Sequence, residues 1–206
     1  MLPTIPMSKH RLVLASTSPY RRSLIERLGV RVETMAPDLD ERAAEQALGP
    51  TTTADLAAAL ALAKARSLAA ICPDALIIGA DQIAELDGQR LHKPGTEEAA
   101  RAQLARLAGR THRLVTAVTV LCAADHRAET AVDVHELTMR PLPHEAIARY
   151  VARDRPLDCA GSYKIESLGI ALFERTSGHD FTAIVGLPLT VLVTLLARFG
   201  VDVLAA

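Results

Sequence analysis

The chain has 206 residues, half of them hydrophobic, and its 23 basic and 24 acidic side chains leave a formal charge of −1. A chain of this length can bury a substantial core, so we expect one domain over residues 10–206, preceded by a short disordered lead at residues 1–9. The charges are spread along the sequence, which argues against a basic nucleic-acid-binding face, and no apolar run reaches the roughly 20 residues of a membrane span.

The first part of the chain alternates short apolar runs with helix-forming stretches. Strands are predicted at residues 11–15 and 30–35, because each run is short, apolar and followed by turn-forming residues. Between them we expect a helix from Pro19 to Leu28, since Ser18 can cap its first turn and Gly29 can end it.

Four further features are predicted before residue 90. The acidic run at residues 38–42 is interpreted as a loop, and residues 55–70 as a helix because strong helix formers fill them. Residues 75–81 have the pattern of a buried strand that ends at Asp81. A hairpin is expected to follow through Asp87-Gly88, a strong short turn signal.

The second part of the chain continues the irregular alternation. The predicted elements are a helix from Thr96 to Gly109, extended stretches at 111–122 and 128–138, a helix at 143–153, a hairpin of residues 169–174 with 181–186, and a last helix at 188–199. Strands thus mix with helices and hairpins, which predicts an α/β protein with a mixed sheet.

Small hydroxyl residues and arginines stand where the first strand enters the first helix. A helix N-terminus presents unpaired N–H groups, and Ser hydroxyls with an Arg fork complement phosphate oxygens. The hydroxyl and guanidinium groups of residues 16–22 are therefore candidate phosphate ligands. Ordinary helix capping explains the serines equally well on this basis alone.

A candidate catalytic acid is Asp81, because a carboxylate at the end of an apolar strand can hold a metal or take a proton from water. A simple turn-capping role is the alternative. Asp38, Asp40 and Glu41 could also help to hold a metal, although a solvated acidic loop is the plainer interpretation. Lys64 and Lys93 are unremarkable by themselves.

Several motifs follow one another in order between residues 12 and 199. They are LVLASTSPYRR, LALAKARS, IIGADQIAELDG, HKP with EEAARAQLARLAGRTH, DCAGSYKIESLGIALFE and IVGLPL. Together they resemble the Maf family of nucleotide pyrophosphatases. The resemblance implies an elongated, mixed-sheet, ITPase-like α/β fold with two lobes around a central cleft, often as a homodimer. It also implies cleavage of nucleoside triphosphates to monophosphates and pyrophosphate. Because a triphosphate carries about four negative charges, we expect this cleavage to need a divalent metal ion, Mg²⁺ or Mn²⁺.

The resemblance also implies roles for particular residues. Asp81 takes the place of the catalytic carboxylate, as the proton acceptor or as a residue that positions the metal. The acidic pair Asp40 and Glu41 falls in the acidic loop of the family. The residues in the positions that hold the triphosphate are Ser16, Ser18, Arg21, Lys64 and Lys93.

Three positions are expected to set the base specificity. Relatives that act on dTTP and UTP have Arg, Thr and Gln where this chain has Tyr20, Gln82 and Glu166, and the pattern here resembles the branch that acts on 7-methyl-GTP. Methylation at N7 gives the guanine ring a positive charge. Tyr20 could stack on this cationic ring, and Glu166 could accept hydrogen bonds from its N1–H and its amino group. The alternative is that Tyr20 is a core aromatic and Glu166 a surface acid.

Other functions remain open at this point. One is a broader pyrophosphatase for altered or canonical nucleotides, and another is a cell-division regulator that acts on septum formation by binding. The presence of Asp81, Lys64 and Lys93 together argues against a degenerate site. The three cysteines lie far apart in no metal-ligand spacing, which favours a reducing, cytoplasmic location. The expected partners are a nucleotide and a second copy of the chain, with neither nucleic acid nor membrane.

Overall fold

The computed structural model describes residues 11–49 and 51–205. The predicted disordered lead at residues 1–9 lies outside this range. The elements run in the order β1 (Arg11–Ala15), α1 (Pro19–Glu26), β2 (Val32–Met35), α2 (Glu41–Leu48), α3 (Thr53–Ser67), β3 (Ala75–Leu86), β4 (Gln89–Leu91), α4 (Glu97–Leu107), β5 (Thr111–Cys122), β6 (Ala128–Met139), α5 (His144–Asp154), the 3-10 helix η1 (Leu168–Leu172), β7 (Phe173–Ser177), α6 (Phe181–Val185), α7 (Leu189–Arg198) and the 3-10 helix η2 (Val203–Ala205).

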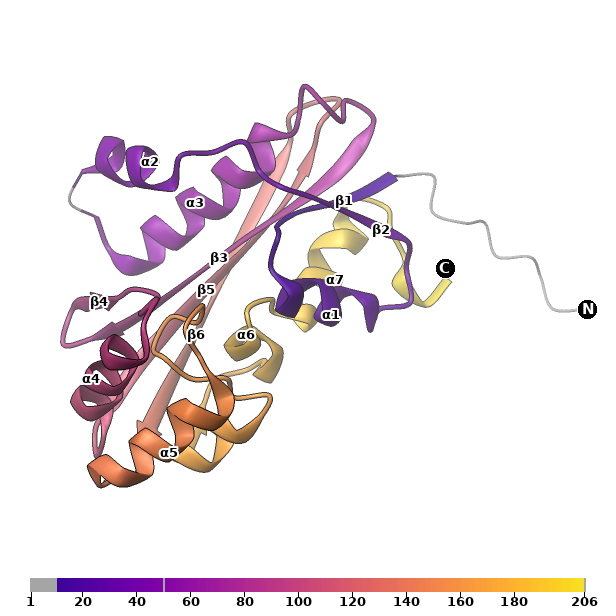
Figure 1. Cartoon of the computed structure of the whole chain (residues 1–206). Coiled ribbons are helices and arrows are strands. Elements are labelled where there is room, and N and C mark those ends of the chain that lie inside the picture. The colour runs from indigo at the N-terminus through magenta and orange to yellow at the C-terminus, as the bar shows by residue number, and fades with distance from the viewer. Residues whose placement is uncertain (1–10, 50, 206) are drawn as a thin grey trace, which may run out of the picture.

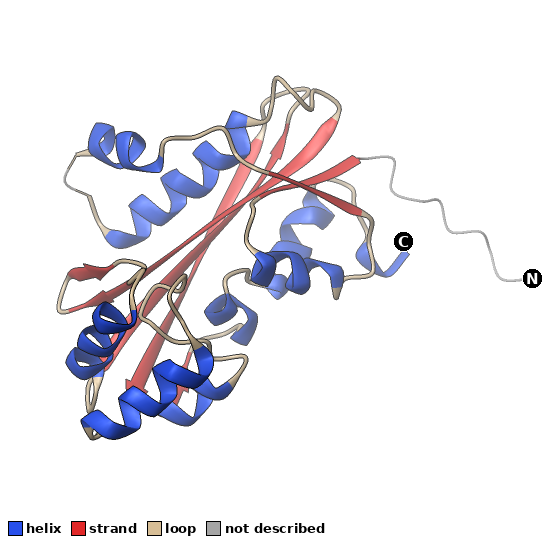
Figure 2. Cartoon of the chain, in the orientation of Figure 1, coloured by secondary structure: helices blue, strands red, loops and turns tan. Residues whose placement is uncertain are grey.

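A single sheet forms the centre of the molecule, with its strands in the order β2-β1-β3-β5-β6-β7 and β4 beside β3 (Figure 2). β1 is parallel to both β2 and β3, and the other pairs are antiparallel. The prediction of a mixed α/β sheet is confirmed. None of the helices in the described ranges is both long and apolar enough to cross a membrane.

Two large hydrophobic cores lie at opposite ends of the long strands β3, β5 and β6 (Figure 1). One core packs α4 and α5 against the end of β3 near Leu86. The other packs α1 and α7 against β1 and the start of β3. Because continuous strands join the two cores, the molecule is elongated with two lobes, as predicted.

The middle of β3 lacks a strand neighbour on one side. β1 pairs with β3 as far as Ile78, and β4 begins to pair with it at Ala84. Among the described residues, no strand covers this edge between those two positions, whereas β5 pairs with β3 from Leu76 to Glu85 on the other side. An opening in the sheet therefore lies between the two lobes.

The prediction that the strand ends at Asp81 is wrong, because β3 continues to Leu86. The residues after Asp81 keep their pairing with β5, and Asp81 itself lies opposite Ala117. The acid therefore stands in the middle of the strand, at the uncovered edge, instead of at a carboxyl end.

The acidic run at residues 38–42 was expected to be a loop, but α2 begins inside it at Glu41. The Asp40 carboxylate accepts a hydrogen bond from the Ala43 amide at 3.0 Å, as an N-cap residue does. The following residues, RAAEQAL, are good helix formers, and the acidic pair belongs to the start of that helix.

The predicted hairpin of residues 169–174 with 181–186 is also wrong. β7 pairs with β6 instead, and residues 181–185 form the short helix α6. Asp180 caps α6 by accepting from the Thr182 amide at 2.9 Å. A short apolar run does not distinguish strand from helix by itself, and here the cap decides.

The other predicted elements are present with boundaries shifted by a few residues at most. The Asp87-Gly88 turn joins β3 to β4 with φ values of 52° and 74°. Two consecutive residues with positive φ are typical of a type I′ hairpin turn, as the Asp-Gly pair predicts.

Candidate active site

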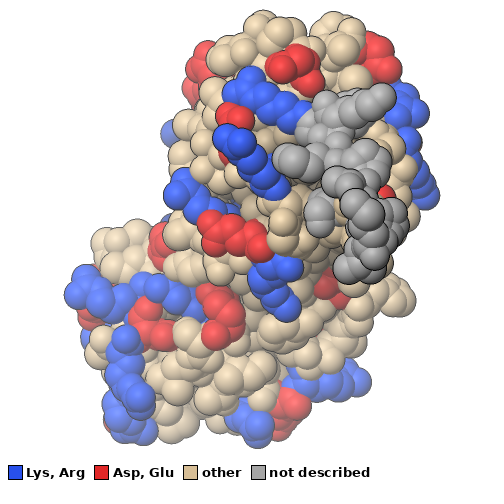
Figure 3. All heavy atoms as spheres, turned by 90° about the vertical axis from the view of Figure 1, so that its right-hand side faces the viewer, with Lys and Arg blue, Asp and Glu red and all other residues tan. Residues whose placement is uncertain are grey.

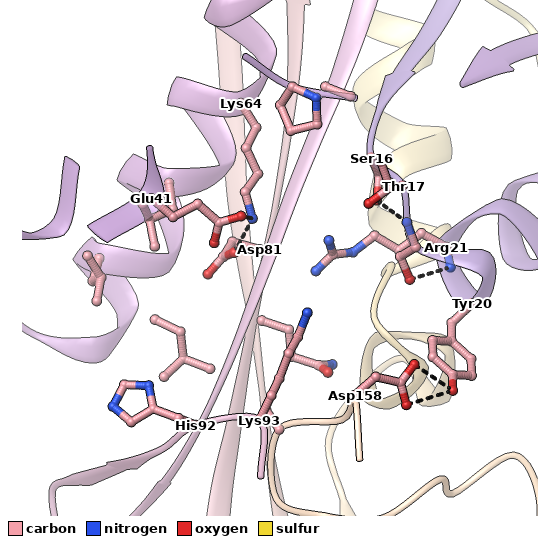
Figure 4. Close-up of a pocket in the computed structure, with 18 of the residues that line it drawn as sticks. Ser16, Thr17, Tyr20, Arg21, Glu41, Lys64, Asp81, His92, Lys93 and Asp158 are labelled. Atoms are coloured by element: carbon pink, nitrogen blue, oxygen red, sulfur yellow. Dashed lines mark hydrogen bonds and ion pairs between the residues drawn. The ribbon is translucent and has the colours of Figure 1, made fainter. Parts of the chain in front are cut away.

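A pocket of about 670 Å³ opens at the uncovered edge of β3, between the two lobes (Figure 4). It is lined by the β1–α1 loop, α2, α3, the middle of β3, β4 and the segment near Asp158. All the predicted phosphate ligands line it: Ser16, Ser18, Arg21, Lys64 and Lys93. The fold therefore brings together residues that are far apart in the sequence.

A buried ion pair lies at the back of the pocket. Lys64 Nζ is 2.6 Å from Asp81 Oδ1 and 3.0 Å from Glu41 Oε1. The side chains of Lys64 and Asp81 are only 6% and 9% exposed, so each charge depends on its partner. Lys64 belongs to the buried stripe of α3, one turn after Leu60, which explains why a lysine in an Ala-rich helix faces β3.

Gly79 allows α3 to approach β3 closely at this point. A Cβ atom at Gly79 would lie 2.0 Å from the carbonyl oxygen of Ala61 and 3.0 Å from the amide of Ala65. Both groups belong to the helix backbone and cannot rotate away. The glycine thus sets the helix-to-strand distance at which Lys64 meets Asp81.

The β1–α1 loop places two hydroxyls and a guanidinium at the pocket wall. Ser16 Oγ accepts from the Ser18 amide at 3.1 Å, and Ser18 Oγ accepts from the Arg21 amide at 3.4 Å. The capping interpretation of Ser18 is confirmed, and each hydroxyl still has a proton to donate to a phosphate.

Arg21 is fixed in place by a hydrogen bond from its Nε to the Gly186 carbonyl at 2.9 Å. Its guanidinium points toward Asp81 (Figure 4). Burial lowers the pKa of this guanidinium, and the carboxylates of Asp81 and Glu41 oppose that shift. A half-buried cation with no direct carboxylate partner in the described chain is suited to receive an anionic ligand.

The residues predicted to bind a metal are only partly assembled. Glu41 and Asp81 converge on Lys64, whereas Asp40 is turned to the N-terminus of α2 and does not line the pocket. Among the described residues, no group of three His, Cys, Asp or Glu side chains is spaced to hold an ion. Two carboxylates fit Mg²⁺, which usually takes one or two protein carboxylates together with substrate phosphates and waters.

A smaller pocket of about 100 Å³ adjoins the first, and Tyr20, Gln82 and Glu166 all line it. Gln82 Nε2 donates to the carbonyls of Ala183 and Ile184 at 2.7 and 3.1 Å, and to a threonine hydroxyl at 3.0 Å. Because backbone carbonyls only accept, they fix which end of the amide is nitrogen. Gln82 Oε1 is therefore the end that remains to accept from a ligand.

Acidic groups flank Tyr20 in this smaller pocket. The Tyr20 hydroxyl donates to both oxygens of the Asp158 carboxylate, at 3.2 and 3.3 Å, which fixes the ring. Desolvation raises the pKa of the Glu166 carboxyl, and the nearby carboxylates of Asp154 and Asp158 raise it further, while Lys164 opposes them. Tyr20 is half-buried and is therefore not a core aromatic, whereas Glu166 is exposed, as the surface-acid alternative predicts.

Sequence reasoning missed four ionisable residues that line the larger pocket: Glu45, Arg90, His92 and Asp158. Two periodicities could have found three of them. Glu45 follows Glu41 by four residues on one face of a helix, and Arg90 and His92 alternate around Leu91 as strand residues do. Asp158 stands at the start of the DCAGSYKIE motif, but nothing local indicates that it contacts Tyr20.

The fold and the site together define the class: α/β proteins with a mixed central sheet and, at its opening between two lobes, a pocket lined by both cations and carboxylates. Within that class, this chain belongs to the Maf family, whose sequence profile, described as Maf-like protein, matches residues 11–199.

Named relatives are similar over almost the whole chain. The 7-methyl-GTP pyrophosphatase of Xanthomonas campestris pv. campestris (strain 8004) is 48% identical over 190 residues, which cover 92% of this chain and 96% of that protein. The 7-methyl-GTP pyrophosphatase of Pseudomonas aeruginosa is 44% identical over 194 residues, which cover 93% and 98%. Among solved structures, the Staphylococcus aureus Ham1 protein aligns with a TM-score of 0.44 and 17% identity over 64% of this chain and 72% of that one.

Proposed function

We propose that this chain is a nucleoside triphosphate pyrophosphatase that hydrolyses 7-methyl-GTP to 7-methyl-GMP and diphosphate, and thereby keeps a modified nucleotide out of nucleic acids. The observation that carries the proposal is the pair of hydrogen-bond acceptors, Gln82 Oε1 and the Glu166 carboxylate, in the smaller pocket. The similarity to proteins named 7-methyl-GTP pyrophosphatase supports it.

The acceptors match one edge of guanine. Guanine presents two donors on its Watson–Crick edge, N1–H and the amino group, and N7-methylation adds a positive charge to the ring. The carboxylates of Asp158 and Glu166 favour that charge, and Tyr20 offers a ring face for stacking. Uracil and thymine carry one N–H between two carbonyl acceptors, so part of their edge would meet acceptors and leave polar groups unpaired.

The larger pocket supplies the groups for cleavage between the α- and β-phosphates. A water oxygen forms a bond to the α-phosphorus while the bond from that phosphorus to the bridging oxygen breaks and diphosphate leaves. Asp81 accepts the proton that the water loses, and Arg21, Lys64 and Lys93 neutralise the charge on the departing diphosphate. A divalent ion held by Asp81 and Glu41 would lower the pKa of a bound water.

The direct test is a panel of 7-methyl-GTP, GTP, UTP and dTTP with Mg²⁺ and Mn²⁺, scored for monophosphate and diphosphate. We expect the highest kcat/KM for 7-methyl-GTP. Equal values for all four nucleotides would favour a broader pyrophosphatase, and the absence of diphosphate release would favour a role in cell division through binding alone.

Replacement of Glu166 by Gln is expected to reduce the preference for 7-methyl-GTP over GTP by roughly 1–3 kcal/mol, because charge-assisted hydrogen bonds are lost. The ratio of kcat/KM values for the two nucleotides measures it. Hydrolysis of UTP should be unchanged or faster. Glu174→Gln, an exposed change on β7 outside both pockets, is the matched control and should leave the ratio unaltered.

The same preference should depend on pH. The Glu166 pKa is raised above its ordinary value of 4.5, so the carboxylate is fully charged only above that raised pKa. We expect the preference to be complete near neutral pH and to fall as the pH drops through the raised pKa. The charge-based account would be contradicted if Glu166→Gln lowered the ratio of kcat/KM values for the two nucleotides while the ratio of the wild-type protein did not change with pH.

Replacement of Lys64 or Lys93 by Met is expected to lower turnover of every nucleotide by a similar factor, since both side chains bind phosphates and not the base. Lys93 is exposed, so its replacement tests phosphate binding with little effect on the fold. Replacement of Lys64 also removes the ion-pair partner of the buried Asp81 carboxylate. Relative rates across the nucleotide panel decide the point. A loss confined to purines or to pyrimidines would show that the lysine reads the base.

The substrate is proposed to be a free nucleotide and not nucleic acid. On the face shown in Figure 3, basic and acidic side chains are interspersed, whereas a nucleic-acid-binding face usually has a basic stripe. A homodimer and a cytoplasmic location remain predictions, which size-exclusion chromatography with light scattering and cell fractionation would test.

A further inference from the structure

The charges that line the larger pocket cancel. Its four cationic side chains are Arg21, Lys64, Arg90 and Lys93, and its four carboxylates are Glu41, Glu45, Asp81 and Asp158. A nucleoside triphosphate carries about four negative charges, so a neutral pocket attracts it only if some cations change partner when it binds.

Two of the four carboxylates come from one helix, α2. Glu41 and Glu45 lie one turn apart, so they share a face, and they pair with Lys64 and Arg90 respectively. None of the residues described in α2 is fully buried, so apolar packing contributes little to its position. The two ion pairs thus link α2 to α3 and β4 across the pocket.

Arg90 lines the larger pocket but not the smaller one, in which the base is proposed to bind. Arg21 and Lys93 line both pockets, whereas Arg90, Lys64 and the glutamates of α2 line only the larger one. A nucleotide with its base in the smaller pocket would therefore extend its terminal phosphates toward Arg90. A guanidinium is suited to this because its planar fork of donors binds phosphate oxygens in pairs.

We propose that Arg90 is a further substrate-binding residue, which Glu45 holds in the ligand-free enzyme and which exchanges this partner for the terminal phosphates of the substrate. The inference rests on the proposed function only in assuming that the pocket receives a polyphosphate. Glu45 acts in place of the ligand, and its release of Arg90 is part of binding.

The test is the affinity for inorganic pyrophosphate, measured by calorimetry in wild type, Arg90→Gln, Glu45→Gln and the double variant. We expect Arg90→Gln to weaken binding by about tenfold or more, and Glu45→Gln to tighten it severalfold, because the competing carboxylate is gone. In the double variant the affinity should match that of Arg90→Gln. If Glu45→Gln tightened binding equally without Arg90, general electrostatics would account for the effect and the proposal would fail.

A purely structural ion pair predicts a different pattern, in which both single variants weaken binding or leave it unchanged. Thermal unfolding of each variant checks the fold, and if Arg90→Gln does not fold, Arg90→Met, which keeps the aliphatic stem, takes its place in the single and the double variant. Arg110→Gln breaks an exposed pair with Asp87 at the same hairpin, outside the pocket, and should not alter the affinity. Because pyrophosphate has no base, this result stands whether or not 7-methyl-GTP is the preferred nucleotide.

Discussion

Replacement of Asp81 by Asn is expected to abolish hydrolysis of every nucleotide while the protein still folds. The change keeps the size of the side chain but removes the charge that would accept a proton or bind a metal ion. The fold should survive because Lys64 retains Glu41 at 3.0 Å as a partner for its charge. Buried Asn can also accept a hydrogen bond from the ammonium through its carbonyl oxygen.

Release of diphosphate at saturating nucleotide measures this effect, with circular dichroism as the check on folding. A rate above about a tenth of the wild-type rate would contradict a catalytic role, given the usual size of acid–base contributions. Asp133→Asn is a suitable control, since Asp133 is also a buried acid within a long strand but lines neither pocket. Its activity should remain close to that of the wild type.

Replacement of Gly79 by Ala is expected to reduce the free energy of unfolding by about 3 kcal/mol and to lower activity in the fraction that folds. The added methyl group would meet the carbonyl oxygen of Ala61 at 2.0 Å, so α3 must move away from β3. Since α3 carries Lys64 and β3 carries Asp81, the same movement lengthens the ion pair at the back of the pocket.

Urea unfolding gives the free energy, and kcat measured well below the transition gives the catalytic part. Gly29→Ala is the matched control because a Cβ atom there meets nothing within 4 Å, and only its positive φ of 69° is unfavourable. That change should reduce stability by about 1 kcal/mol and leave kcat unchanged. An equal effect of the two substitutions on kcat would show that the spacing of α3 and β3 does not control the site.

Much of the fold was predictable because its elements have local signals. β1 and β5 have the predicted boundaries, and α1, α3 and α4 have side-chain caps at their N-termini. The errors arose where a local pattern allowed two structures. An acidic run became the start of α2 once Asp40 capped it, and an apolar run after Asp180 became α6.

The site was predictable as a set of residues but not as a geometry. The motifs identified Lys64, Asp81 and Gln82, yet the orientation of the Gln82 amide depends on carbonyls of α6 about a hundred residues later in the chain. The contact of Tyr20 with Asp158 likewise joins segments 138 residues apart. No local pattern encodes these pairings, because they arise from how the two lobes are placed on the shared strands.

The uncovered edge of β3 also affects how its backbone behaves toward solvent. Central strands of a sheet normally give slow amide hydrogen exchange, since each N–H is bonded to a neighbouring strand. Between Ile78 and Ala84 the groups of β3 that point away from β5 have no strand partner in the described chain, and Asp81, Gln82 and Ile83 line the pocket there. Deuterium uptake at the amides that point away from β5 should be fast in the free protein and slow with a nucleotide bound. Exchange at the centre of the sheet would therefore measure whether the pocket is occupied.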